Sequence, residues 1–170
     1  MKRSGRTLKQ RLYGIKHVGS YLCRARYFRG HGVHSPYIYS IVRHVFMSSK
    51  LNAEHRDLYN ALLTYDVPKR RATELQNLVA HCNYASWSID NLKECDMLVA
   101  TMNTTCEYLE EYASYAKERG ITLCIMRPYN NAERWAVCSR IIEEHQSTTV
   151  DNRGYLLVFN NHLPKQRFRL

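Results

Sequence analysis

In the second half of the chain, short apolar runs alternate with amphipathic helical patterns. Cys95–Thr101 and Ile121–Met126 are continuous β-rich runs, as expected of strands buried on both faces of a parallel sheet. Between them, Thr104-x-x-Glu107 is a capping box that predicts a helix start, and Gly120 predicts the helix end. One face of this helix carries the side chains expected to point inward: Leu109, Tyr112, Ala113 and Ala116. The pattern therefore predicts strand, helix, strand.

The same alternation continues towards the C-terminus. Asn130 or Asn131 can cap a second helix, whose apolar side carries Trp135, Cys138, Ile141 and Ile142. The runs 148–150 and 155–159 flank a turn in which Gly154 can supply a positive φ, and they predict a β-hairpin. A last short strand is expected over 166–170. This order predicts a mostly parallel sheet, to whose edge the hairpin adds an antiparallel strand.

Helical patterns dominate the first half. Ser35 suits an N-cap and Pro36 the first helical position. The apolar residues that follow lie on one stripe: Ile38, Ile41, Val42, Val45 and Phe46. A second helix is expected over 53–65, capped by Asn52 and ending before Pro68, because the residue preceding proline disfavours the helical region.

The middle of the chain gives weaker signals. Lys69-Arg70-Arg71 is interpreted as a solvated turn. A short helix through Leu75, Leu78 and Val79 and a strand near 84–89 are expected to follow it.

The charge of the chain is unevenly distributed. Residues 1–50 hold eleven Lys or Arg and no acid, which leaves 14 bases and all 15 acids for residues 51–170. We therefore divide the chain into a basic, helical N-terminal segment, 1–50, and an α/β domain, 51–170. The segment is expected to bind nucleic acid or an acidic protein. Its polyanion-binding candidates are Lys2, Arg3, Arg6, Lys9, Arg11, Lys16, Arg24 and Arg26.

Residues 7–24 of this segment predict an amphipathic helix. Its apolar stripe consists of Leu8, Leu12, Ile15, Val18 or Gly19, and Leu22. Three interpretations stay open: docking on the rest of the chain, which we favour, contact with RNA, or binding to an anionic membrane surface.

Other features bound the class of protein. No apolar run approaches membrane-spanning length and no secretory signal pattern opens the chain, so a cytoplasmic protein is expected. The six cysteines form no CxxC pair and are expected to be reduced thiols, mostly buried. His31 and His34 could begin a metal site, but no third ligand lies nearby, so we expect no bound metal.

The string Arg29-Gly30-His31-Gly32-Val33-His34-Ser35-Pro36 joins the basic segment to the first well-capped helix. A glycine-rich loop that opens a helix can bind an anion or a cofactor. The candidates for that role are Arg29, Gly30, Gly32 and Ser35, and the candidates for catalysis are His31 and His34. The alternative is a tight turn with surface histidines, which residue chemistry alone favours.

This string resembles the opening of a group of bacterial class I S-adenosylmethionine-dependent methyltransferase-like proteins, and the C-terminal order of elements is similar to theirs. The resemblance covers 20–65 and 95–170. It implies an α/β fold with a reduced Rossmann-like methyltransferase sheet, mostly parallel with a C-terminal antiparallel hairpin.

The chain departs from that family where the cofactor is held. The family uses an acidic residue and glycines after its first strand, and a second acidic residue on the next strand. None of the seven glycines here lies at such a turn. Where the family's fourth and fifth strands are followed by acids, this chain has 100–103 (Ala-Thr-Met-Asn) and 127–129 (Arg-Pro-Tyr).

Three functional hypotheses follow. The first is a shortened pseudoenzyme that has lost S-adenosylmethionine binding, needs no cofactor, and acts as a noncatalytic binding or scaffold protein through its basic arm. The second is an active S-adenosylmethionine-dependent methyltransferase whose pocket combines the 30–35 loop with Asp66, Glu74 or Asp90. The third is a peripheral membrane-surface protein that lies on residues 7–24. An open sheet edge also makes a homodimer plausible.

Overall fold

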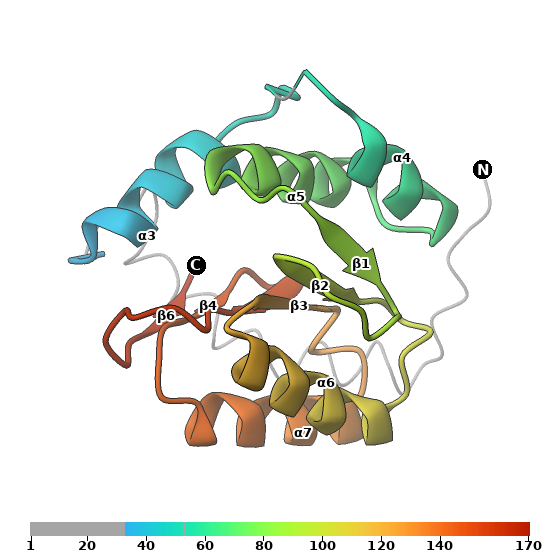
Figure 1. Ribbon diagram of the computed structural model, residues 1–170, viewed down its shortest axis with the longest axis vertical. Coiled ribbons are helices and arrows are strands. Elements are labelled where there is room, and N and C mark those ends of the chain that lie inside the picture. The colour runs from blue at the N-terminus through green and yellow to red at the C-terminus, as the bar shows by residue number, and fades with distance from the viewer. Residues whose placement is uncertain (1–32, 53) are drawn as a thin grey trace.

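A computed structural model describes residues 33–52 and 54–170. It has an α/β architecture in which two helical layers enclose one sheet (Figure 1). One layer contains α3 (Pro36–Ile41) with its π-helical continuation η2 (Val42–Phe46), α4 (Asp57–Thr64) and α5 (Lys69–His81). The other contains α6 (Cys106–Arg119) and α7 (Ala132–Glu144). No described helix is long and apolar enough to cross a membrane.

The sheet is mixed and mostly parallel. Its strands are β1 (Trp87–Ile89), β2 (Met97–Ala100), β3 (Thr122–Met126), β4 (Thr149–Asp151), β5 (Tyr155–Val158) and β6 (Arg167–Arg169). Their spatial order is β1-β2-β3-β5-β4-β6, and β5 runs antiparallel to both of its neighbours. The remaining pairs are parallel.

The predicted hairpin is confirmed as β4–β5, but the prediction that it lies at the sheet edge with its antiparallel strand outermost is wrong. Strand β5 lies inside the sheet, between β3 and β4. All four of its residues are buried, so an edge position would expose apolar surface. The outer place belongs to β6, whose two arginines are exposed on either side of buried Phe168.

The sheet has a hydrophobic core on each face, because side chains alternate along a strand. Met97 and Val99 of β2 join the core under α3, α4 and α5. Leu98 and Ala100 join the core under α6 and α7. Burial on both faces explains why the strands read as continuous apolar runs.

The helix start at Ser35 is confirmed. The backbone N–H of Ile38 donates to Ser35 Oγ at 3.4 Å, and Pro36 occupies the first turn. The predicted stripe is buried apart from Phe46, which is partly buried. Tyr37 packs edge-to-face on Phe159 with ring centroids 5.7 Å apart. The described end of the basic segment therefore shares a core with the α/β domain.

Two helix starts differ from prediction. The helix expected from residue 53 begins at Asp57, and Asn52 does not cap it. The backbone N–H of Asn52 instead donates to Asn77 Oδ1 at 2.9 Å, which ties the preceding loop to α5. The expected turn at residues 69–71 is the first turn of α5, because Pro68 is the N-cap residue and the helix starts directly after it.

The prediction of a capping box at Thr104 is also wrong. Thr105 is the N-cap of α6 and makes no capping bond with its side chain, while the Thr104 hydroxyl is used elsewhere. At the other end of α6, Gly120 has φ +67° and closes the helix as predicted. In the hairpin turn, the positive φ falls on Arg153 (+54°) rather than on Gly154.

Candidate functional site

Polar side chains converge where the parallel strands β1, β2 and β3 end. In open α/β sheets, this carboxyl edge is where ligands usually bind. Asp90 follows β1 directly, with φ +50°. Thr101 follows β2, and Arg127 follows β3 with φ +47°. Residues in this left-handed region are uncommon unless they are Gly or Asn, so two tight reversals shape this edge.

The Asp90 carboxylate links the ends of β1 and β2. One oxygen accepts from the backbone N–H of Thr101 at 2.6 Å and from the Thr104 hydroxyl at 2.5 Å. The other accepts from the Thr101 hydroxyl. Both threonines are buried. A carboxylate with three donors is well stabilised, and here all three donors come from its own chain.

Arg134, on α7, completes this network. Its side chain is 2% exposed, although it lies on a helix. The guanidinium donates to the carbonyl oxygens of Thr101 (2.9 Å), Thr104 (2.9 Å) and Met126 (3.2 Å). Burial lowers the pKa of this guanidinium, which nevertheless stays charged because an arginine cannot be deprotonated in proteins. Arg134 therefore fastens the loop after β2 and the end of β3 to α7.

Two small cavities remain open beside this network. One of about 210 Å³ is lined by Pro68, Arg71, Met126, Arg127, Tyr129, Asn130, Arg153 and Gly154. The other, of about 180 Å³, is lined by Tyr65, Asp66, Val67, Pro68, Thr101, Met102, Asn103, Met126 and Arg127. Each is smaller than the roughly 300–1,000 Å³ of typical small-molecule pockets. The two share Pro68, Met126 and Arg127 as a common wall.

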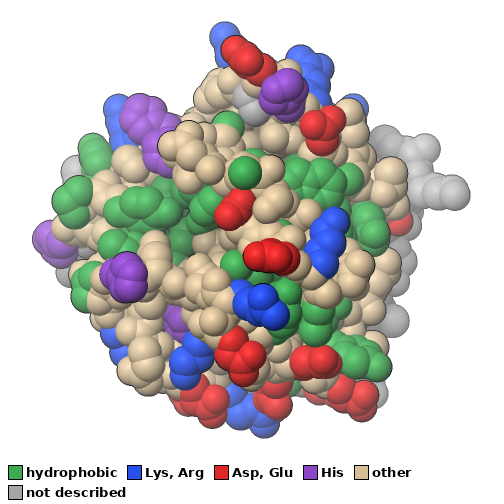
Figure 2. Space-filling model, viewed as in Figure 1, with side chains coloured by type: hydrophobic (Ala, Val, Ile, Leu, Met, Phe, Trp, Pro, Cys, Tyr) green, Lys and Arg blue, Asp and Glu red, His purple; other side chains and the backbone are tan. Residues whose placement is uncertain are grey.

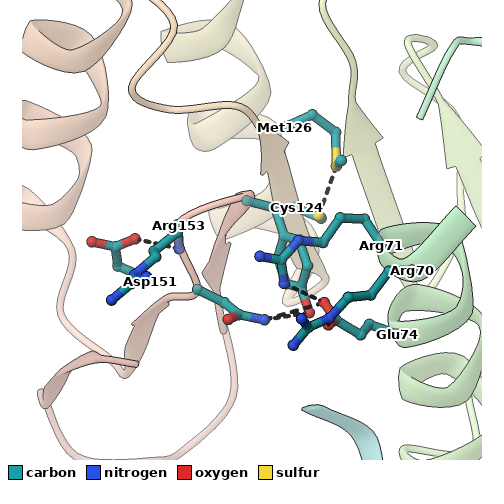
Figure 3. A network of polar contacts seen from close by, with 9 residues as sticks. Arg70, Arg71, Glu74, Cys124, Met126, Asp151 and Arg153 are labelled. Atoms are coloured by element: carbon teal, nitrogen blue, oxygen red, sulfur yellow. Dashed lines mark hydrogen bonds and ion pairs between the residues drawn. The ribbon is translucent and has the colours of Figure 1, made fainter. Parts of the chain in front are cut away.

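The first cavity borders an ion-pair network on α5 (Figure 3). Glu74 is 1% exposed and accepts from Arg70 Nε at 3.0 Å and Arg71 Nη1 at 2.6 Å. The Asn152 amide of the β4–β5 turn donates to the same carboxylate at 3.3 Å. The Arg71 guanidinium also lies over the Tyr155 ring, 5.6 Å from its centroid.

Gly154 makes the position of Arg71 sterically possible. A Cβ atom at this glycine would lie 2.4 Å from Arg71 Nε. Gly154 was predicted for its backbone conformation, but its lack of a side chain matters here because the Arg71 side chain crosses the turn.

The sequence candidates fall in several places. Ser35 is buried and engaged as the helix cap, and His34 is exposed. Asp66 lines the second cavity, while Glu74 and Asp90 belong to separate networks. Outside the described residues lie Arg29, Gly30, His31, Gly32 and all eight polyanion-binding candidates, together with the predicted helix 7–24.

Sequence reasoning missed Arg134, Thr101 and Thr104. Arg134 directly precedes Trp135 and follows Glu133 in the first turn of α7, so its position in the sequence does not distinguish it from a solvent-exposed arginine. A clue was the threonine at 101, which ends an apolar strand where a polar hydroxyl needs a partner.

Cysteine and histidine chemistry does not build a further centre in the described part of the chain. Cys82, Cys95, Cys106, Cys124 and Cys138 are free thiols, three of them buried, as predicted. Among residues 33–52 and 54–170, no group of three or more His, Cys, Asp or Glu side chains could hold a metal ion.

Comparisons with protein-family models, curated proteins and solved structures gave no match for this chain.

Proposed function

We propose that this protein is a noncatalytic binding protein on a shortened methyltransferase-like fold, and that its basic N-terminal arm contacts nucleic acid or an acidic protein. The observation that carries the first part is the network at the carboxyl edge of β1 and β2. A methyl transfer enzyme must hold its sulfonium cofactor there in a fixed orientation. In this chain Asp90, Thr101 and Arg134 bond to one another across that edge instead.

The sheet supports the same proposal. It is mostly parallel, with one antiparallel strand contributed by the C-terminal hairpin, which agrees with the sheet that the resemblance implies. Strand β1 is outermost among the described strands. Within residues 33–52 and 54–170, no strand therefore lies beyond β1 to carry the second acidic residue of the family pattern.

The distribution of charge supports the role of the arm. Residues 51–170 are nearly neutral in sum. Figure 2 shows acidic and basic side chains interspersed on the viewed face, most clearly over α6 and α7. A surface of mixed sign has little long-range attraction for a polyanion, whereas eleven bases without an acid have a strong one.

The test measures the binding of full-length protein to an RNA and a DNA oligonucleotide and to polyglutamate at several salt concentrations. The arm variant replaces Lys2, Arg3, Arg6 and Lys9 by Gln, and the matched control replaces Arg56, Lys93, Lys117 and Arg140 by Gln. The slope of log affinity against log salt on an oligonucleotide should fall by about three to four for the arm variant and change little for the control. Binding that is indifferent to salt, or equal losses in both variants, would refute the role of the arm.

The pseudoenzyme part has its own experiment. Calorimetric titration with S-adenosylmethionine and S-adenosylhomocysteine should give no saturable heat. Saturable binding that Asp90→Asn weakens would overturn the proposal and favour the enzyme.

A further inference from the structure

The cavity beside α5 carries a marked imbalance of charge. Among the described residues, three arginines line it, Arg71, Arg127 and Arg153, and no acidic residue does. Like charges gathered around a small cavity repel one another, and the repulsion is stronger near low-dielectric protein than in water. An anion in the cavity would remove that repulsion.

Two acids on the elements that line the cavity are already engaged. Glu74 accepts from two arginines and from Asn152. Asp151 accepts from the Tyr129 hydroxyl and from the backbone N–H of Arg153 at 3.0 Å. Figure 3 shows Arg153 directed towards the Asp151 side of the turn, away from Arg70 and Arg71. Arg71 of α5 and Arg127, which follows β3, bring positive charge to the cavity from two different elements.

Arg127 is the central residue. Its guanidinium has five N–H donors, and none of them has a hydrogen-bond or ion-pair acceptor in the described part of the chain. The side chain is nevertheless half-buried. Its backbone is held in place, since the Arg127 N–H donates to Gly154 O at 2.8 Å. The fold thus fixes the Arg127 backbone beside a cavity, and residues 33–52 and 54–170 supply no acceptor for its guanidinium.

Arg71 contributes further donors from α5. One of its five N–H groups donates to Glu74, and the guanidinium is oriented by the Tyr155 ring. Arginine binds phosphate oxygens in a bidentate manner, and two guanidinium groups match the double charge of a phosphate monoester. Asn130, in the same loop as Arg127, also lines the cavity.

We infer that this cavity binds a phosphate group between Arg71 and Arg127, and that the group attached to the phosphate extends into the neighbouring cavity. That second cavity adjoins the first, since Pro68, Met126 and Arg127 line both, and Val67 and Met102 add apolar side chains to it. Its acidic residue, Asp66, is suited to accept from a hydroxyl of the attached group and disfavours a second anion there. All described residues that line the two cavities lie outside residues 1–50 in the sequence.

The phosphate can belong to a small free ester or to the end of a nucleic acid. The experiment therefore titrates full-length protein with inorganic phosphate, with glycerol phosphate, and with a 5′-phosphorylated oligonucleotide against its 5′-hydroxyl twin. Binding is followed through the arginine Nε–H resonances by NMR. The variants are Arg127→Gln and Arg127→Lys, and Arg56→Gln removes an equal charge at an exposed position of the same protein. Arg71 is left unchanged, because its loss would unpair buried Glu74.

Saturable binding of phosphate or glycerol phosphate, weakened at least about tenfold by R127Q, less by R127K and not by R56Q, supports a small-molecule site. A preference for the 5′-phosphorylated oligonucleotide that R127Q abolishes supports a nucleic-acid end. If no probe binds, or if R56Q weakens binding as much as R127Q, the inference is wrong. The quadruple arm variant should retain the Arg127-dependent binding of inorganic phosphate, so failure of the arm and failure of this site are distinguishable.

Discussion

Arg134→Met should destabilise the fold far more than any exposed arginine substitution. Methionine fills most of the same volume, so the main loss is that of the guanidinium donors. Three buried carbonyl groups, those of Thr101, Thr104 and Met126, would be left without their partner. An unsatisfied buried group costs about 1–3 kcal/mol, so for three groups we expect a loss of about 3–9 kcal/mol. That is a large part of the roughly 5–15 kcal/mol by which domains are stable.

Urea unfolding followed by circular dichroism measures the free energy of unfolding. Arg140→Met is the matched control, because Arg140 is on the same helix, is 58% exposed, and pairs with exposed Glu110 at 2.5 Å. Exposed pairs contribute only about 0–1 kcal/mol. Arg134→Lys should cause an intermediate loss of stability. A lysine ammonium group lacks the planar fork of the guanidinium, so it cannot donate to all three carbonyl groups at once. If R134M and R140M cost the same within about 1 kcal/mol, the role assigned to Arg134 is wrong.

Three further predictions concern other parts of the fold. Gly154→Ala should push Arg71 away from Glu74 and lower the free energy of unfolding by about 1–3 kcal/mol. In a double-mutant cycle with Arg71→Gln, the two losses of stability should be less than additive. Full additivity would contradict the steric argument. His145 is buried, with Nε2 2.7 Å from Phe159 O. Burial lowers the pKa of its imidazole, so the neutral ring is favoured in the fold. Stability should therefore fall as pH drops below about 6.5, and the fall should be smaller in His145→Gln, as measured by urea unfolding between pH 5 and 7.5. Burial raises the pKa of Cys138 to about 12 and that of Cys124 higher still, so mass spectrometry after iodoacetamide treatment at pH 8 should find both unmodified in native protein and modified in urea.

The sequence allowed prediction of the elements that burial patterns specify. Strands β2 and β3 read as continuous apolar runs because both faces are covered, and α6 ends at a glycine whose backbone conformation requires it. The π-helical turn η2 was not foreseen, because its buried residues Val42 and Val45 also fit an α-helical stripe.

The candidate site was harder to predict because it depends on pairing between distant residues. Thr104 has the spacing of a capping residue, yet its hydroxyl is drawn to Asp90, 14 positions earlier. That outcome follows from the parallel pairing of β1 and β2, which brings the ends of the two strands together. Glu74 likewise looks like a surface residue of a charged helix until the β4–β5 turn covers it with Asn152.

The interior position of β5 has a consequence for the order in which the chain can fold during synthesis. Strands β1, β2 and β3 leave the ribosome first and can pair at once, since all three are parallel neighbours. The inner edge of β3 then stays unpaired until residues 155–158 emerge. These residues also include Tyr155, whose ring packs against that of Phe46 in η2 with the ring centroids 6.2 Å apart. Until then an apolar strand with free N–H and C=O groups is exposed, which is the kind of surface that chaperones and aggregation both select. A nascent chain halted before residue 155 is therefore expected to be much more prone to aggregation than one halted after residue 170.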